Sequence, residues 1–303
     1  MNYLQAQSCT MTDRTSTKLF IPHPAEASCN LVGILEQLDP RQSTQERSIA
    51  LWYRVEQKIT SSRHKDYLYQ KRLARRLPLD SFRFDFRGNH ESGGKWKQGA
   101  LDEDLVDIQV VVDYLKANYG YVVDLVVGHS RGSIVSFRWL CTSEDGKKVS
   151  AFVNASGRYR MGKIVENAAG KIWREHLETQ ESYSWNVSVA RKMLTATITR
   201  EDLANFISFD TSLVWDRFPH STDAITIHGL SDTTVPPYDA FIYSQALGNR
   251  TPGTHTLCLL EDADHNFTGR QDEVVDVILH WWETRKRGQL KTGVLAPGVK
   301  GKL

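Results

Sequence analysis

Apolar runs alternate with amphipathic segments along most of the chain. The runs are five or six residues long and rich in Val, Ile, Leu and Phe, as is typical of strands buried in a sheet. They cover residues 31–35, 48–53, 81–86, 122–127, 150–155, 224–228 and 256–260. Between them, apolar residues at three- and four-residue spacing predict helices, among them residues 67–77, 101–115, 133–140 and 274–282. Strands that alternate with helices predict an α/β fold with a mostly parallel sheet flanked by helices.

The alternation stops between residues 160 and 220, which follow the strand predicted at 150–155. We expect this stretch to be wholly helical and to form a cap inserted over the strand ends. It is rich in aromatic residues, and Trp173, Trp185 and Trp215 are its candidates for binding substrate. The alternative is a surface excursion that packs these side chains onto the core.

The pattern predicts a core built from residues 18–159 and 221–286, with the cap formed by residues 160–220. Residues 1–17 and 287–303 are expected to be mobile tails, because they lack a sustained apolar period and the second is rich in Gly and Lys.

Composition narrows the functional classes. A chain of 303 residues with 24% charged residues fits one large α/β domain with an insertion. A net charge of +2 gives no reason to expect nucleic acid as a partner. The four cysteines have no metal-ligand or disulfide spacing, and no metal ion or organic cofactor is expected.

The same sequence gives a weak indication of location. No apolar run approaches the ~20 residues that span a bilayer, and residues 1–17 lack the apolar stretch of a signal peptide. A cytoplasmic protein is expected, although Gly301-Lys302-Leu303 weakly matches a peroxisomal address. The oligomeric state is left open.

A serine stands between two glycines where a predicted strand meets a predicted helix. The segment Gly128-His129-Ser130-Arg131-Gly132 follows the run at 122–127 and leads into the helix at 133–140. This order is typical of a nucleophile elbow, in which a sharp turn exposes the serine hydroxyl above the sheet. Glycines at these positions let the strand and the helix approach closely. Ser130 is therefore the candidate nucleophile.

A serine hydroxyl needs a base to become a good nucleophile, and the base needs an acid to orient it. After such an elbow the acid comes next along the chain and the histidine last. Asp232 lies just past the strand predicted at 224–228, at the strand end where open α/β sheets build their sites. It is the preferred acid, and Asp210 and Asp239 are the fallbacks.

His265 is the preferred base, because it occupies the last strand-to-helix loop. His228 and His255 lie in or beside predicted strands, and His129 lies within the turn itself, so none of the three is placed to reach Ser130 from outside.

These motifs together resemble the α/β hydrolases, in particular the serine-aminopeptidase-like branch that includes cinnamoyl (feruloyl) esterases and monoacylglycerol lipases. The matching segments lie between residues 47 and 283 and are Arg83-Phe84-Asp85-Phe86-Arg87-Gly88, Glu91-Ser92-Gly93, Gly128 to Gly132, His228-Gly229-Leu230-Ser231-Asp232 and Asp264-His265. The resemblance implies that Ser130 is the nucleophile, His265 the base and Asp232 its orienting acid. It further implies that the backbone N–H of Arg131 is one oxyanion donor.

Two positions depart from the family pattern. Members usually carry His-Gly after the strand that matches residues 48–53, and that loop supplies the second oxyanion donor. Here no glycine follows until Gly88. Losing one such donor typically costs about 10²–10³ in turnover. Three interpretations of residues 53–64 are open. The loop presents a different N–H, the protein is a weakened or non-catalytic relative, or the sequence there comes from a misread gene model. The second departure is His90, where the family usually has glycine.

The resulting hypothesis is a serine hydrolase that cleaves an ester, amide or thioester of a small, apolar or aromatic acyl substrate through an acyl-enzyme on Ser130. The alternatives are a ligand-binding relative with little or no turnover and, third, an acyltransferase on the same fold. The Arg131 side chain could meet a substrate carboxylate, but a residue at this position more often pairs with a nearby acid.

Overall fold

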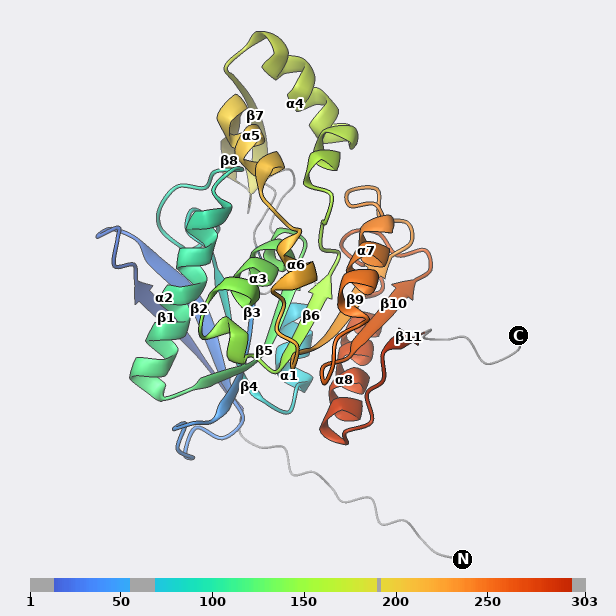
Figure 1. The fold of residues 1–303 in the computed structure, drawn as a ribbon. Coiled ribbons are helices and arrows are strands. Elements are labelled where there is room, and N and C mark those ends of the chain that lie inside the picture. The colour runs from blue at the N-terminus through green and yellow to red at the C-terminus, as the bar shows by residue number, and fades with distance from the viewer. Residues whose placement is uncertain (1–13, 55–68, 190–191, 296–303) are drawn as a thin grey trace, which may run out of the picture.

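The computed structural model describes residues 14–54, 69–189 and 192–295, which build one large sheet with helices on both faces (Figure 1). The nine strands of the sheet lie in the order β1-β2-β4-β3-β5-β6-β9-β10-β11. Their bounds are β1 (Thr15–Pro22), β2 (Asn30–Gln37), β3 (Ser48–Arg54), β4 (Asp80–Asp85), β5 (Val122–His129), β6 (Ala151–Ala155), β9 (Asp223–Gly229), β10 (His255–Leu260) and β11 (Gly293–Leu295). All neighbouring strands from β4 to β11 pair in parallel, and β2 alone runs against its neighbours.

The helices cover the two faces of this sheet. They are α1 (Gln70–Arg76), α2 (Leu101–Tyr119), α3 (Arg131–Thr142), α7 (Tyr238–Leu247) and α8 (Gln271–Lys286). One apolar core contains side chains of α2, α3 and α7, and a second contains those of α1 and α8. The central strands lie between both cores, so every residue of β4, β6 and the second half of β5 is buried. The expected α/β fold with a mostly parallel sheet is therefore confirmed.

Parallel pairing brings the carboxyl ends of β5, β6, β9 and β10 to one edge of the sheet. His129 at the end of β5 pairs with Ala155 at the end of β6, and Leu260 at the end of β10 pairs with Gly229 at the end of β9. Loops that follow these strands are consequently neighbours, however far apart they are in the chain.

The segment between β6 and β9 is an insertion above this edge, as expected, but it is not wholly helical. It holds α4 (Ala168–Thr179), α5 (Arg200–Ser208) and the short α6 (Leu213–Asp216), together with a hairpin of β7 (Ser182–Val189) and β8 (Lys192–Thr199). In β8, alternation of Thr with apolar residues favours a two-residue period over a helix. The prediction of an all-helical cap was wrong at this hairpin.

The ends of the sheet also extend past the expected core. Strand β1 begins at Thr15 rather than after residue 17, and β11 pairs with β10 within the predicted second tail. Strand β1 is mostly exposed and β11 is three residues long, so neither carries the sustained apolar run of a buried strand. Among the described residues, no helix is both long and apolar enough to cross a membrane.

Candidate active site

Ser130 occupies the turn between β5 and α3, in a strained backbone conformation. Its φ of 56° and ψ of −122° lie in a region that residues other than glycine rarely adopt. Such a conformation costs on the order of 1–3 kcal/mol and persists only where the surroundings enforce it. The strand on one side and the helix on the other therefore fix the direction of the Ser130 hydroxyl.

The two glycines of the motif make this turn possible. A Cβ on Gly128 would lie 2.6 Å from Cα of Ser133, and one on Gly132 would lie 2.9 Å from the carbonyl oxygen of Tyr53. Both neighbours are backbone atoms, which could move away only at a considerable cost in free energy. The spacing in the sequence thus reflects two close backbone approaches around Ser130.

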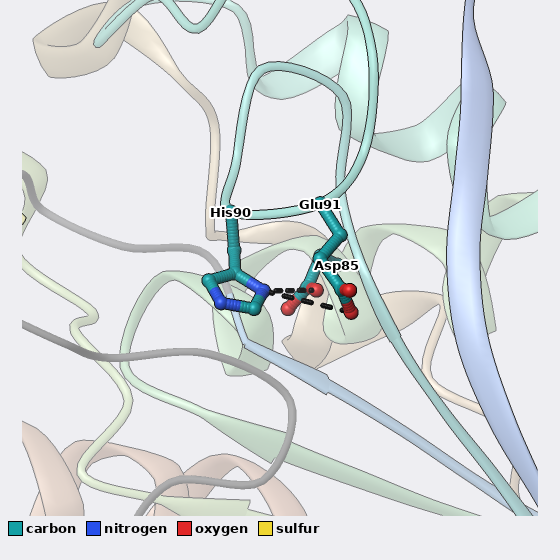
Figure 2. A group of neighbouring side chains, drawn as sticks. All are labelled: Asp85, His90 and Glu91. Atoms are coloured by element: carbon teal, nitrogen blue, oxygen red, sulfur yellow. Dashed lines mark ion pairs between the residues drawn. The ribbon is translucent and has the colours of Figure 1, made fainter. Parts of the chain in front are cut away.

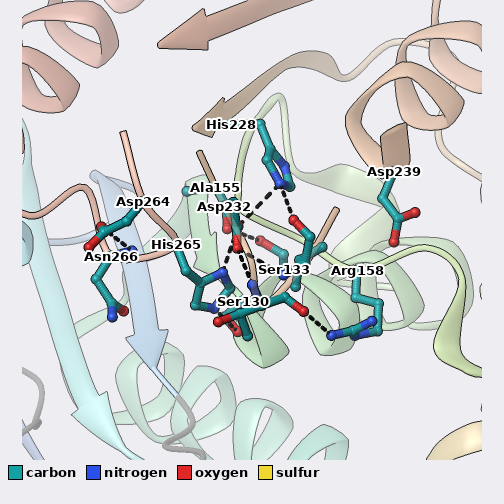
Figure 3. Close-up of polar contacts among 12 residues, drawn as sticks. Ser130, Ser133, Ala155, Arg158, His228, Asp232, Asp239, Asp264, His265 and Asn266 are labelled. Carbon is teal, nitrogen blue, oxygen red and sulfur yellow. Dashed lines mark hydrogen bonds and ion pairs between the residues drawn. The ribbon is translucent and has the colours of Figure 1, made fainter. Parts of the chain in front are cut away.

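The structure brings Ser130, His265 and Asp232 into one hydrogen-bonded chain (Figure 3). His265 Nε2 lies 2.9 Å from Ser130 Oγ, and His265 Nδ1 lies 2.8 Å from Asp232 Oδ2. A carboxylate accepts only, so Nδ1 carries the proton that it donates to Asp232. Nε2 is then left with a lone pair directed at the Ser130 hydroxyl.

The loop after β10 holds His265 in place. The Asp264 carboxylate accepts the backbone N–H groups of Asn266 and Thr268, each at 2.9 Å. Phe267 is fully buried and packs edge-on against Tyr69. The His265 carbonyl lies 2.9 Å from Nε2 of His129, whose ring is buried beneath the turn. These contacts fix the backbone before and after His265 and thereby the position of its imidazole.

Asp232 is held as a carboxylate by the loop after β9. Its Oδ1 accepts the backbone N–H groups of Thr234 and Val235, both at 2.8 Å, and His228 Nε2 lies 3.2 Å from Oδ2. Burial alone would raise the pKa of Asp232, but hydrogen bonds with His228 and His265 outweigh it and hold the pKa well below its usual value. Asp232 is therefore ionised at neutral pH.

Arg131 presents its backbone and its side chain to different partners. As the first residue of α3, it has no intrahelical acceptor for its backbone N–H. Its guanidinium turns away to Asp104 of α2, with Nε 2.7 Å from Oδ2, and also donates to the backbone carbonyl of Gln98. The expected pairing of this side chain with a nearby acid is confirmed.

A small cavity of about 20 Å³ adjoins Ser130. It is bounded by apolar and polar side chains and by the start of α3, and its lining residues are Gln98, Ser130, Arg131, Ile134, Arg158, Phe206, Thr234 and Val235. Sequence reasoning missed Gln98, Arg158 and Phe206. Arg158 could have been found, because it lies three residues past the end of β6 and hence at the same sheet edge as the serine.

The three tryptophan candidates of the cap do not line this cavity. Trp173 and Trp185 pack against each other, with ring centroids 5.9 Å apart, and line a separate hollow of about 120 Å³ between α4 and the hairpin. Trp215 is 44% exposed and donates its Nε1–H to Tyr159 Oη. These aromatic residues build the cap itself, and Phe206 of α5 is the cap side chain that reaches the cavity.

The remaining titratable candidates are engaged elsewhere. Asp210 accepts hydrogen bonds from Ser212, and Asp239 pairs with Arg160 at 2.6 Å. His255 Nε2 lies 2.9 Å from Thr226 Oγ1 inside the sheet. Of the loop expected to hold a second oxyanion donor, Tyr53 and Arg54 end β3, while residues 55–68 lie outside the described residues.

His90 stands in a cluster with Asp85 and Glu91 that could in principle ligate a metal ion (Figure 2). Its Nδ1 lies 3.4 Å from Asp85 Oδ2 and 3.8 Å from Glu91 Oε2, while Glu91 also pairs with Lys18 at 2.7 Å. The φ of His90 is 43°, a left-handed conformation in which glycine is favoured. This conformation is one that a glycine, which the family resemblance led us to expect at this position, would adopt with less strain than His90.

Comparisons with known proteins identify the fold that carries these residues. No protein-family model matches the chain. A Saccharomyces cerevisiae protein of uncharacterized function, YDL057W, is 26% identical over 235 residues, which cover 69% of this chain and 67% of that protein.

Solved structures match nearly the whole chain at low identity. Est1E of Butyrivibrio proteoclasticus with bound ferulic acid aligns with a TM-score of 0.65 at 15% identity and covers 89% of this chain and 99% of its own. The esterase Pf2001 of Pyrococcus furiosus aligns with a TM-score of 0.59 at 18% identity, covering 91% and 92%. A Xanthomonas campestris serine hydrolase described as lacking a lid aligns with a TM-score of 0.56 at 17% identity, covering 90% and 94%. The chain therefore has the fold of the α/β hydrolases.

Proposed function

We propose that the protein is a serine hydrolase that cleaves an ester of a small acyl substrate through an acyl-enzyme on Ser130. The observation that carries this proposal is the hydrogen-bonded chain from Ser130 through His265 to Asp232. A serine held in a strained turn, a base 2.9 Å from its oxygen and an ionised acid behind the base are the parts that acyl transfer requires.

In the proposed first step, Ser130 Oγ attacks the substrate carbonyl while its proton passes to His265 Nε2. The developing negative charge on the carbonyl oxygen is stabilised by the backbone N–H of Arg131, to which the helix dipole of α3 adds. Asp232 stays ionised and stabilises the imidazolium. His265 then gives the proton to the leaving alcohol, and the bond between acyl carbon and alcohol oxygen breaks.

In the second step, water attacks the acyl-enzyme. His265 takes a proton from the water, and the tetrahedral intermediate collapses to release the acid and return the proton to Ser130. The cavity beside Ser130 is lined by Ile134, Phe206 and Val235 as well as by polar groups, which supports a small acyl group. The esterase neighbours, one of them solved with ferulic acid, support ester over amide chemistry.

A fluorophosphonate probe, which reacts with activated serines, tests the proposal. The wild-type protein and Ser133→Ala should be labelled, and Ser130→Ala should not. Ser133 is a matched control, because it lies in the first turn of the helix that Ser130 precedes and donates its hydroxyl to the Ala155 carbonyl. The wild-type protein and Ser133→Ala should also hydrolyse p-nitrophenyl acetate, and Ser130→Ala should not.

Two outcomes would contradict the proposal. A folded wild-type protein that resists labelling and hydrolyses no short ester would favour a binding protein without turnover. Esters of added alcohols, formed in preference to the free acid, would favour an acyltransferase.

A further inference from the structure

The guanidinium of Arg158 lies buried beside the proposed nucleophile. Arg158 is 2% exposed and lines the same cavity as Ser130 (Figure 3). Its Nη2 donates to the carbonyl oxygen of Thr234 at 2.5 Å, whereas its Nη1 is buried and has no hydrogen-bond partner among the described residues. Tyr243 Oη donates to the Arg158 carbonyl at 2.7 Å and fixes the backbone from which the side chain extends.

The acids nearest to this guanidinium are occupied by other groups. Asp239 accepts the backbone N–H groups of Tyr159 and Arg160 and pairs with the Arg160 side chain. Asp232 serves two histidines and two backbone N–H groups, as described above. Burial lowers the pKa of Arg158, with the charges of Asp239 and Asp232 acting against it, but a guanidinium stays protonated in proteins.

A second polar side chain lines the cavity without satisfying its hydrogen bonds. Gln98 is 1% exposed, and within the described part of the chain neither its amide nitrogen nor its amide oxygen has a hydrogen-bond partner. Its backbone carbonyl is held by Arg131. The cavity beside Ser130 therefore offers a cation and an amide donor, both buried and both with unused N–H groups.

Buried charges in folded proteins are ordinarily paired, because an uncompensated charge is costly to desolvate. An anion that enters the cavity would supply the missing partner. We propose that Arg158 and Gln98 form a subsite for a substrate carboxylate, so that the preferred substrate is an ester that carries a carboxylate close to the scissile bond. This inference rests on the proposed function at Ser130 and specifies its substrate class.

The guanidinium has a structural task that must be separated from this role. Through the Thr234 carbonyl, Arg158 holds the loop that presents Asp232. A purely structural Arg158 would affect the hydrolysis of all esters by the same factor. A carboxylate-binding Arg158 discriminates between charged and neutral esters, so the informative quantity is the ratio of their kcat/KM values.

The test compares monomethyl glutarate with its neutral counterpart, the methyl ester of glutaric acid monoamide, by titrating the acid released at constant pH. We expect the wild-type protein to prefer the carboxylate by about 10- to 100-fold in kcat/KM, the range of a hydrogen-bonded charge. In Arg158→Met this preference should disappear. Arg158→Lys, which keeps the charge but loses the planar fork, should retain part of it.

Arg138→Gln is the matched control. It removes one guanidinium that donates to the Asp210 carbonyl and does not line the cavity, so the preference should persist. A second substrate, 4-acetoxybutanoate, carries its carboxylate on the leaving group rather than on the acyl group. Whichever of the two charged esters has the higher kcat/KM shows whether the subsite binds a carboxylate on the acyl group or on the leaving group.

Glutarate binding to Ser130→Ala, measured by calorimetry, provides a readout that needs no turnover. Binding that is lost in Ser130→Ala/Arg158→Met supports the subsite, even if wild-type hydrolysis is undetectable. Hydrolysis of both esters at equal kcat/KM, or a preference that survives Arg158→Met, overturns the subsite and leaves the hydrolase proposal intact. Absence of fluorophosphonate labelling at Ser130 overturns the hydrolase proposal itself.

Discussion

At the scale of single residues, the site depends on how three side chains divide their hydrogen bonds. His265 uses Nδ1 for Asp232 and Nε2 for Ser130, so its tautomer is set by the acid behind it. Asp232 in turn uses one oxygen for backbone N–H groups and the other for imidazoles. Each group is oriented by the one behind it, and in the proposed mechanism the proton of Ser130 moves to His265 Nε2 while Asp232 stays ionised.

Replacement of Asp232 tests this order. In Asp232→Asn the amide group can donate to His265 Nδ1, which favours the tautomer with its proton on Nε2, where it cannot accept the serine proton. We expect kcat for a short ester to fall by about 10³–10⁴. In Asp210→Asn the changed carboxylate accepts hydrogen bonds only from Ser212 among the described residues, so kcat should stay within about twofold of wild type. A comparable loss of kcat in Asp210→Asn would contradict the assignment of Asp232 as the acid.

The lowered pKa of Asp232 also makes stability depend on pH. Because the folded state holds this carboxyl below its unfolded pKa of about 3.9, its contribution is present above that pH and is lost as the pH falls. Urea unfolding at pH 7 should show Asp232→Asn to be less stable than wild type by about 1.5–3 kcal/mol. The difference between the two free energies of unfolding should become smaller below about pH 5. A difference that grew below this pH would contradict a lowered pKa of Asp232.

At the scale of secondary-structure elements, the close approach of β5 and α3 is the feature that the motif encodes. Gly128→Ala places a methyl group against the backbone of Ser133, and Gly132→Ala places one against the Tyr53 carbonyl. We expect each to lower the free energy of unfolding by about 1–3 kcal/mol, as overpacking does. In Gly162→Ala the nearest atom is a side-chain carbon 4.0 Å away, so chemical denaturation should show no loss.

Sequence alone predicted the elements whose pattern is strong and failed where the pattern is short or local. The central strands, α2, α3 and α8 have long apolar periods and were expected, as were the positions of Ser130, Asp232 and His265 on loops at one sheet edge. Strands β1 and β11 at the sheet edges and the β7–β8 hairpin were missed. The place of Arg158 just past β6 could have been predicted from the sequence, but the unpaired state of its Nη1 among the described residues could not, because it depends on which acids other residues occupy.

At the scale of the whole molecule, the cap shares an apolar core with one face of the sheet, and the opposite face has a core of its own. Trp173 is buried and packs with Trp185 within the cap, whereas Trp281 of α8 is buried against the sheet. Because Trp173 packs on Trp185 at the cap end of the shared core, Trp173→Ala should loosen the cap most, and hydrogen exchange should rise more in residues 168–186 and 195–208 than in the strands of the sheet. Trp281→Ala should lower global stability by about 3–5 kcal/mol. Equal exchange throughout the chain in Trp173→Ala would show that cap and sheet unfold together.

The distance along the chain between serine and imidazole has a consequence for synthesis. Ser130 and His265 are separated by 135 positions, and Asp232 comes between them. A growing polypeptide that has already formed β5 and α3 still carries an unactivated hydroxyl, since His265, the proposed base, has not been made. If the protein is the proposed hydrolase, its activity arises only after translation has passed β10, and prematurely terminated products that lack that region should hydrolyse no ester.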